Sequence, residues 1–143
     1  MEHTGWWLKS FLEGFDAEGQ EEIRDKVIEG CGRACFKNCG ITDTVKECAL
    51  AAKDTASLIE ELNNRHIGGG KLALEGNTIT GIYDQCYCPT MKASEGTLPE
   101  SFCNCTRGWT KELFETALGR PVDVELVQSI RRGDACCKFV VKL

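Results

Sequence analysis

The chain of 143 residues has no long apolar run, only two histidines and no excess of basic residues. No stretch approaches the roughly 20 apolar residues that cross a bilayer, so the sequence predicts no membrane span. Lys and Arg number 17 against 22 Asp and Glu, and the net charge of −5 argues against a nucleic-acid partner, which needs a basic face. Walker, Rossmann, nucleophile-elbow and paired-carboxylate patterns are also absent.

The segment Met1–Gly19 lacks the apolar core of a secretory signal peptide, because Glu2, Lys9, Glu13 and Asp16 interrupt it. We therefore expect a cytoplasmic protein whose ten cysteines are reduced or metal-bound. The alternative is a mature secreted form with disulfides.

Hydrophobic residues make up 42% of the chain, which is enough for a packed core in a single domain over residues 1–143. The apolar periodicity predicts a helical part over residues 1–66 and a sheet-containing part over 71–143. The expected elements are helices near 6–15, 17–38 and 42–64, a hairpin over 71–88, a loop over 89–100, a helix over 110–118 and a hairpin over 122–141. This order predicts an α+β fold: N-terminal helices packed on an antiparallel sheet made of two hairpins with an intervening helix.

The aromatic residues of the first helix allow two interpretations. Trp6 and Trp7 form either a patch for a partner or a membrane surface, or a cover over the core, and we favour the core. As a patch, the two tryptophans would allow a homodimer.

Cysteine supplies the strongest local signal, in the motifs Cys86-Tyr87-Cys88 and Cys103-Asn104-Cys105. On an extended strand, residues two apart point to the same face. We therefore expect each motif to present two sulfurs in one direction. Together the two motifs would make a four-thiolate site for zinc or an iron–sulfur cluster.

Three further cysteines, Cys31, Cys35 and Cys39, recur every four residues on one helix and so share one face. They are either small buried hydrophobes or additional metal ligands. Cys48 falls on the apolar stripe of the next helix and is expected in the core. Cys136 and Cys137 are expected on the last strand, with side chains on opposite faces.

Few other residues suggest chemistry. His66 precedes a glycine run and is expected on a surface loop. Asp84 is either a base, a hydrogen-bond acceptor that orients a neighbouring ligand residue, or an ordinary carboxylate at a strand edge. The pair Arg131-Arg132 is most simply a charged hairpin turn. No catalytic residue is assigned.

The C-terminal segment resembles a known group of domains. From Phe102 to Leu143 a Cys-x-Cys motif and a helix lead through Gly119-Arg120-Pro121-Val122 to the hairpin Gly133-Asp134-Ala135-Cys136-Cys137-Lys138-Phe139. This segment is similar to the end of 4-vinyl reductase-type domains and of their relatives grouped with L-2-amino-thiazoline-4-carboxylate hydrolase. The resemblance implies an α+β fold, often dimeric, sometimes with a pocket for an apolar ligand, and it places Cys136 at the family's hairpin cysteine.

Three functions follow from these observations. The first is a cysteine-rich domain that binds zinc or an iron–sulfur cluster for structure or redox sensing, through Cys86, Cys88, Cys103 and Cys105 with Cys31, Cys35 and Cys39. The second is a module that binds a small apolar ligand. The third is a hydrolase of a small cyclic sulfur–nitrogen substrate, which rests on the resemblance alone.

Overall fold

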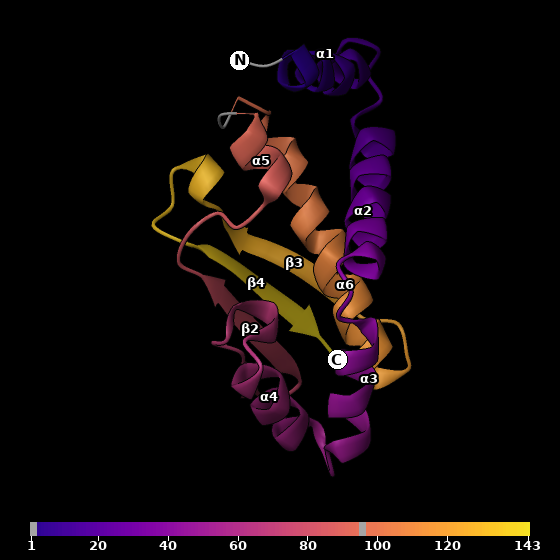
Figure 1. Ribbon diagram of the computed structural model, residues 1–143. Coiled ribbons are helices and arrows are strands. Elements are labelled where there is room, and N and C mark those ends of the chain that lie inside the picture. Colours follow the sequence, from indigo (N-terminus) through magenta and orange to yellow (C-terminus); the bar gives the residue numbers. More distant parts are fainter. Residues whose placement is uncertain (1–2, 95–96) are drawn as a thin grey trace.

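The computed structural model describes residues 3–94 and 97–143, which fold as helices around a four-stranded antiparallel sheet (Figure 1). The helices are α1 (His3–Ala17), α2 (Glu21–Asn38), α3 (Thr42–Ala51), α4 (Thr55–Asn64), α5 (Pro89–Ala93) and α6 (Asn104–Leu118). The strands are β1 (Ala73–Glu75), β2 (Thr78–Tyr83), β3 (Asp123–Gln128) and β4 (Cys137–Lys142). Short 3-10 turns are η1 (Ile67–Gly69), η2 (Glu100–Cys103) and η3 (Ile130–Arg132). The predicted α+β class is confirmed.

The sheet has the strand order β1-β2-β4-β3, so two hairpins are joined through β2 and β4. The first hairpin turns at Gly76, whose φ of 61° lies in the left-handed region that favours glycine. The prediction that this hairpin continues to Cys88 is wrong. β2 ends at Tyr83, opposite Cys137, because its partner β4 begins there and the next residues have no strand to pair with.

The helix predicted over residues 42–64 is broken in two. Asp54 caps the start of α4: its carboxylate accepts a hydrogen bond from the Ser57 amide at 2.8 Å, and the Ser57 hydroxyl accepts one from the Asp54 amide at 3.1 Å. This reciprocal pair satisfies amides that have no partner within the helix, so it favours a new helix start. Thr42 is the first residue of α3 rather than its cap, a position that Ile41 takes.

Helices α2 and α6 cross with their backbones in direct contact. A methyl group added to Gly32 would lie 2.0 Å from the Cys105 carbonyl oxygen, and one added to Gly108 would lie 1.9 Å from the Glu29 carbonyl oxygen. An ion pair joins Lys111 to Glu29 at 2.8 Å beside this crossing. Only glycine permits so close an approach, so these two positions fix how α6 lies on α2.

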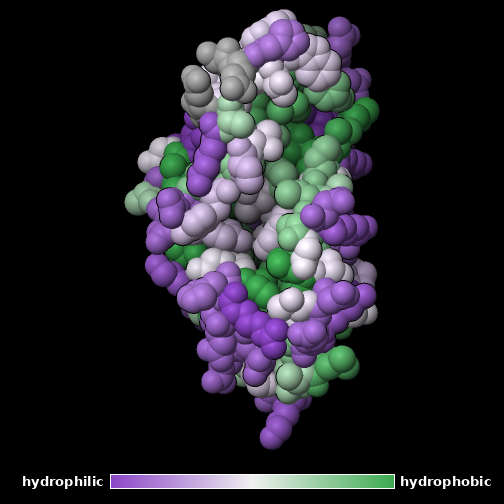
Figure 2. Space-filling view, in the orientation of Figure 1, coloured by the Kyte–Doolittle hydropathy of each residue, from purple (hydrophilic) through white to green (hydrophobic). Residues whose placement is uncertain are grey.

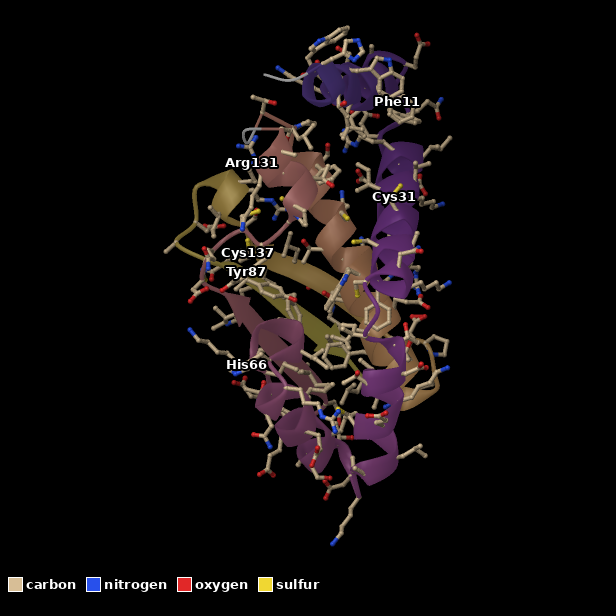
Figure 3. The ribbon with its side chains drawn as sticks, in the orientation of Figure 1. Phe11, Cys31, His66, Tyr87, Arg131 and Cys137 are labelled. Carbon is tan, nitrogen blue, oxygen red and sulfur yellow. The ribbon has the colours of Figure 1, made fainter. Side chains whose placement is uncertain are left out.

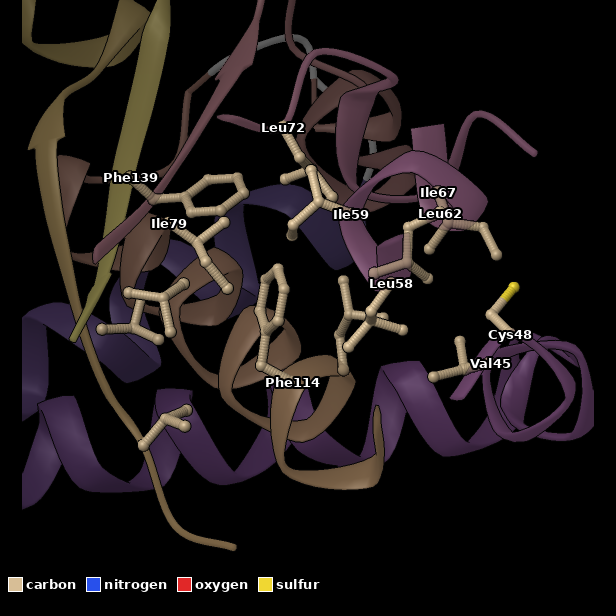
Figure 4. Packing of buried hydrophobic residues seen from close by; sticks show 14 of the residues in the cluster. Val45, Cys48, Leu58, Ile59, Leu62, Ile67, Leu72, Ile79, Phe114 and Phe139 are labelled. Carbon is tan, nitrogen blue, oxygen red and sulfur yellow. The ribbon is translucent and has the colours of Figure 1, made fainter. Parts of the chain in front are cut away.

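The core lies between α3, α4 and α6 and the sheet (Figure 4). Phe114 of α6 and Phe139 of β4 are almost fully buried, and the Phe139 ring covers Gly81 of β2. Cys48 is fully buried, so its predicted place in the core is confirmed. The burial of these side chains supplies the main driving force for folding of this part of the chain.

Helix α1 lies across the end of α2 (Figure 1). Its side chains Trp6, Trp7 and Phe11 are exposed. Trp6 is 45% exposed and Trp7 is 52% exposed, so the prediction that they cover the core is wrong. Ile23 and Val27 of α2 are also exposed. Figure 2 shows hydrophobic surface along α2. Among the residues described, no helix is long and apolar enough to cross a membrane.

Candidate ligand-binding pocket

The two Cys-x-Cys motifs do not lie on strands. Cys86 follows the end of β2, Cys88 caps α5, Cys103 ends η2, and Cys105 lies in the first turn of α6. Consecutive residues of a helix are rotated by about 100°, so residues two apart point in nearly opposite directions. The extended backbone that the prediction assumed is therefore absent at Cys103-Asn104-Cys105, which runs from η2 into α6.

The two motifs nevertheless meet. Cys86, Cys88, Cys103 and Cys105 all line one pocket, together with Cys137 from the start of β4. The remaining wall comes from six other side chains: Met91, Phe102, Thr106, Leu126, Ile130 and Arg131. The cavity volume is about 40 Å³. The pocket thus lies where α5, η2 and the start of α6 face the β3–η3–β4 hairpin.

Ser129 organises the hairpin side of the pocket. It is fully buried, its amide donates to the Asp134 carboxylate at 2.8 Å, and its carbonyl accepts from the Asp134 amide at 3.1 Å. Its hydroxyl lies 3.4 Å from the Cys103 sulfur. These bonds close the hairpin at the predicted Gly133-Asp134 position and hold one pocket thiol in place.

The local environment raises the pKa of two pocket thiols, Cys103 and Cys105. Burial raises the pKa of Cys103, the hydrogen bond with Ser129 opposes that rise, and the nearby Cys137 and Cys86 add to it. Burial also raises the pKa of Cys105 to about 12, and neighbouring thiols reinforce the shift. These two thiols are therefore uncharged at neutral pH.

Arg131 is the exception in this wall. Its guanidinium donates a hydrogen bond to the Leu98 carbonyl, and its backbone amide donates to the Ser129 hydroxyl at 3.2 Å. Its Nε is buried and has no hydrogen-bond partner among the residues described. A buried donor without an acceptor is costly, so an acceptor that reached this atom would add a stabilising hydrogen bond.

The remaining predicted cysteines lie outside the pocket wall. Cys31, Cys35 and Cys39 share one face of α2, as predicted, but that face is exposed, so their interpretation as buried hydrophobes is wrong. Cys136 precedes β4, and its sulfur donates a hydrogen bond to the Gln128 side chain at 3.3 Å.

His66 and Asp84 do not join the pocket wall. His66 is exposed at the end of α4 with a φ of 54°, and Figure 3 shows it well apart from Arg131 and Cys137. Asp84 is exposed and accepts a hydrogen bond from the Tyr87 hydroxyl at 2.8 Å, and this bond is the main reason that its pKa is lowered.

No preformed metal centre is found in residues 3–94 and 97–143. In that part of the chain no three His, Cys, Asp or Glu side chains are placed to hold an ion. The shared pocket of the two motifs is thus observed, whereas zinc or iron–sulfur binding by the seven predicted cysteines stays a prediction.

Sequence reasoning missed Ser129 and Arg131. The serine carries no chemical signal of its own, because its role arises from hairpin closure and burial. The arginine pair was interpreted as a charged turn. Arg131 is partly buried, whereas Arg132 is exposed. This difference depends on η3, which the sequence did not predict.

Solved structures define the class of fold. The phenol-responsive sensory domain of the transcription activator PoxR, solved with phenol, resembles the chain with a TM-score of 0.56 and 12% sequence identity. The match covers 99% of this chain and 74% of that one. At this identity the likeness shows a shared fold.

The chain itself belongs to DUF6144, a family of unknown function, whose match covers residues 2–143. No curated protein sequence matches it significantly. The resemblance of residues 102–143 to 4-vinyl reductase-type domains and the hydrolase group stays a prediction.

Proposed function

We propose that the protein is a small-molecule-binding module whose ligand occupies the pocket between α5, η2, α6 and the β3–η3–β4 hairpin. One observation carries this proposal: the buried Nε of Arg131 has no acceptor among the described residues, in a wall otherwise made mainly of sulfur and hydrocarbon. A ligand with an oxygen or nitrogen acceptor would complete that hydrogen bond while its apolar part contacts Met91, Phe102 and Leu126.

The size of the pocket limits the ligand. A cavity of about 40 Å³ accommodates the centres of roughly three waters. We therefore expect a ligand of few heavy atoms, or one that enters as the wall side chains move apart. The ligand of the PoxR sensory domain, phenol, combines a hydrocarbon ring with one oxygen, which makes phenol a suitable first probe beside smaller carboxylic acids.

The alternative functions have less support in this geometry. A metal centre would need at least three converging ligands, and no such group of side chains is placed to hold an ion among the described residues. A hydrolase would need an activated nucleophile, whereas burial raises the pKa of Cys103 and Cys105, and a protonated thiol is a weak nucleophile.

Isothermal titration calorimetry with phenol, acetate and butyrate tests the proposal on the wild-type chain and two variants. Arg131→Lys keeps the positive charge but removes Nε, and Arg132→Lys makes the same change in the exposed neighbour outside the pocket wall. We expect saturable binding of at least one probe and about a tenfold weaker affinity for Arg131→Lys alone. Absence of binding by all three probes, or equal losses in both variants, would overturn the proposal.

A further inference from the structure

Helix α6 buries one hydroxyl group without a hydrogen-bond partner. Thr110 is 0% exposed, and its Oγ1 has no partner among the residues that the structure describes. A threonine hydroxyl in a helix often bonds to the carbonyl four residues earlier, but Thr110 makes no such bond. Burial of an unpaired hydroxyl is costly, because the group loses its hydrogen bonds to water and gains none in return.

The rotation of α6 turns the Thr110 side chain away from α2 and toward the sheet. Gly108 lies against the backbone of Glu29 in α2, and Thr110, two residues later, is rotated by about 200° from it. Thr106 lies one turn before Thr110 on the same side of the helix and lines the pocket. Phe114 lies one turn after Thr110 and belongs to the core. Thr110 therefore occupies the boundary between the pocket and the core.

The sheet has the same order from pocket to core. Cys137 of β4 lines the pocket, and Phe139, two residues later on the same face of the strand, belongs to the core. Leu126 of β3 pairs with Phe139 and also lines the pocket. One further turn of α6, about 6 Å, separates Thr106 in the wall from Thr110. A ligand that deepened the pocket by this distance would reach the unpaired hydroxyl.

We propose that Thr110 determines specificity in the ligand site proposed above, and that the ligand is a short hydroxy acid. Its carboxylate would accept a hydrogen bond from the Nε of Arg131, and its hydroxyl would pair with the Thr110 hydroxyl. This inference rests on the proposed function and adds a second polar contact to it.

The chemistry of the two protein groups favours this class of ligand. Arg131 donates to the Leu98 carbonyl, which carries no formal charge, and a guanidinium forms its stronger hydrogen bonds with carboxylates. The Thr110 hydroxyl can both donate and accept, so it matches a ligand hydroxyl in either direction. The pocket wall between the two groups includes Leu126 and Ile130, which suits a hydrocarbon chain between the two polar ends of the ligand.

Butyrate provides the matched ligand for the test, because it has the carboxylate and the hydrocarbon chain but no hydroxyl. Bound butyrate would leave Thr110 unpaired, as it is in the free protein. We expect 3-hydroxybutyrate or 4-hydroxybutyrate to bind the wild-type chain about tenfold more tightly than butyrate does, because one of them gains the bond to Thr110.

Isothermal titration calorimetry measures the three acids on the wild type, Thr110→Val and Thr42→Val. Valine keeps the shape of threonine without the hydroxyl. Thr42 is the matched control, because its Oγ1 is also buried without a partner among the described residues, but it lies at the start of α3 outside the pocket wall. We expect Thr110→Val to bind all three acids with the affinity of butyrate, and Thr42→Val to keep the preference for the hydroxy acid.

Thermal unfolding of the unliganded variants separates recognition from a structural role. We expect the melting temperature of Thr110→Val to equal or exceed that of the wild type, since a methyl group replaces an unpaired buried hydroxyl. Loss of butyrate binding in Thr110→Val, or a hydroxy-acid preference that survives in this variant, would overturn the inference.

The ligand series distinguishes this inference from the proposed function. Equal affinity of the wild type for all three acids would overturn the role of Thr110 and leave the ligand site in place. Absence of binding by all three acids would overturn the inference, and absence of binding by phenol and acetate as well would overturn the proposed function.

Discussion

Burial distinguishes cysteines that look alike in the sequence. Cys48 is fully buried in the core, Cys105 is partly buried at the α2–α6 crossing, and Cys39 is exposed at the C-cap of α2. The spacing of four residues correctly placed Cys31, Cys35 and Cys39 on one face. The spacing carried no information on whether that face is buried or exposed, because its burial depends on how α6 packs on α2 at Gly32 and Gly108.

Alkylation should follow these environments. The thiolate is the reactive form, and burial raises the pKa of Cys105 to about 12. At pH 8 we expect iodoacetamide to label the exposed Cys39 well before Cys105, and the rate at Cys105 to increase about tenfold per pH unit up to pH 10. Peptide mass spectrometry after timed quenching measures both rates. Labelling of Cys105 as fast as Cys39 at pH 8 would contradict the assigned environment.

At the scale of elements, the ends of helices and strands were harder to predict than their existence. The apolar stripe over residues 42–64 continues across the break between α3 and α4, so periodicity alone could not show it. The local signal was the pair Asp54 and Ser57, three residues apart. The strand predicted through Cys88 failed for a non-local reason, since its length depends on where β4 begins.

The Asp54 cap gives a pH-dependent prediction. The backbone hydrogen bond from Ser57 is the main cause that lowers the pKa of Asp54. Because its pKa is lowered in the folded protein, the ionised Asp54 carboxylate stabilises the fold at pH values above the ordinary carboxyl pKa. This stabilisation is lost as the pH falls through and below that pKa. We expect Asp54→Ala to lower the melting temperature at pH 7, and the difference from wild type to shrink near pH 3.

Lys53→Ala is the control for this cap. Only the backbone amide of Lys53 donates a hydrogen bond to the Ser57 hydroxyl, so replacing the Lys53 side chain leaves that bond in place. Differential scanning calorimetry at pH 7, 5 and 3 follows both variants. A deficit in Asp54→Ala that is the same at each pH would contradict a charged cap.

The α2–α6 crossing gives a second prediction for an element. In Gly32→Ala the new methyl group would meet backbone atoms, which cannot move aside as a side chain can, so we expect a loss of about 3 kcal/mol or more in unfolding free energy. Gly30→Ala lies two residues away with nothing within 4 Å, and should instead gain about 0.5–1 kcal/mol through higher helix propensity.

Urea denaturation monitored by circular dichroism compares these two alanine variants. The opposite signs are the informative result, because both variants make the same chemical change in the same helix. Equal effects would mean that α6 does not approach α2 at Gly32.

At the scale of the whole molecule, the sequence was sufficient for the class and order of the fold. Two hairpins, the N-terminal helices and α6 between the hairpins follow from changes in apolar period. The prediction of a loop over 89–100 is wrong at α5 (Pro89–Ala93). The pocket was not predictable in the same way, because its wall combines five cysteines with Arg131 from segments whose spatial order depends on the β2–β4 pairing.

The exposed apolar surface of α1 and α2 also belongs to this scale. Trp6, Trp7 and Phe11 of α1 and Ile23 and Val27 of α2 are exposed, and exposed apolar surfaces commonly mark contact sites. The homodimer that the sequence allows stays a prediction, which sedimentation velocity across a range of protein concentrations can measure.

The most direct measurement of the central claim is the NMR signal of the Arg131 Nε–H group in 15N-labelled protein, assigned by its loss in Arg131→Lys. During titration with phenol, acetate and butyrate, we predict that at least one probe shifts this signal saturably, together with the amides of Ile130 and Cys137 around the pocket. Shifts that occur only elsewhere, or an Arg131 signal that none of the three probes affects, would contradict a ligand site built around this arginine.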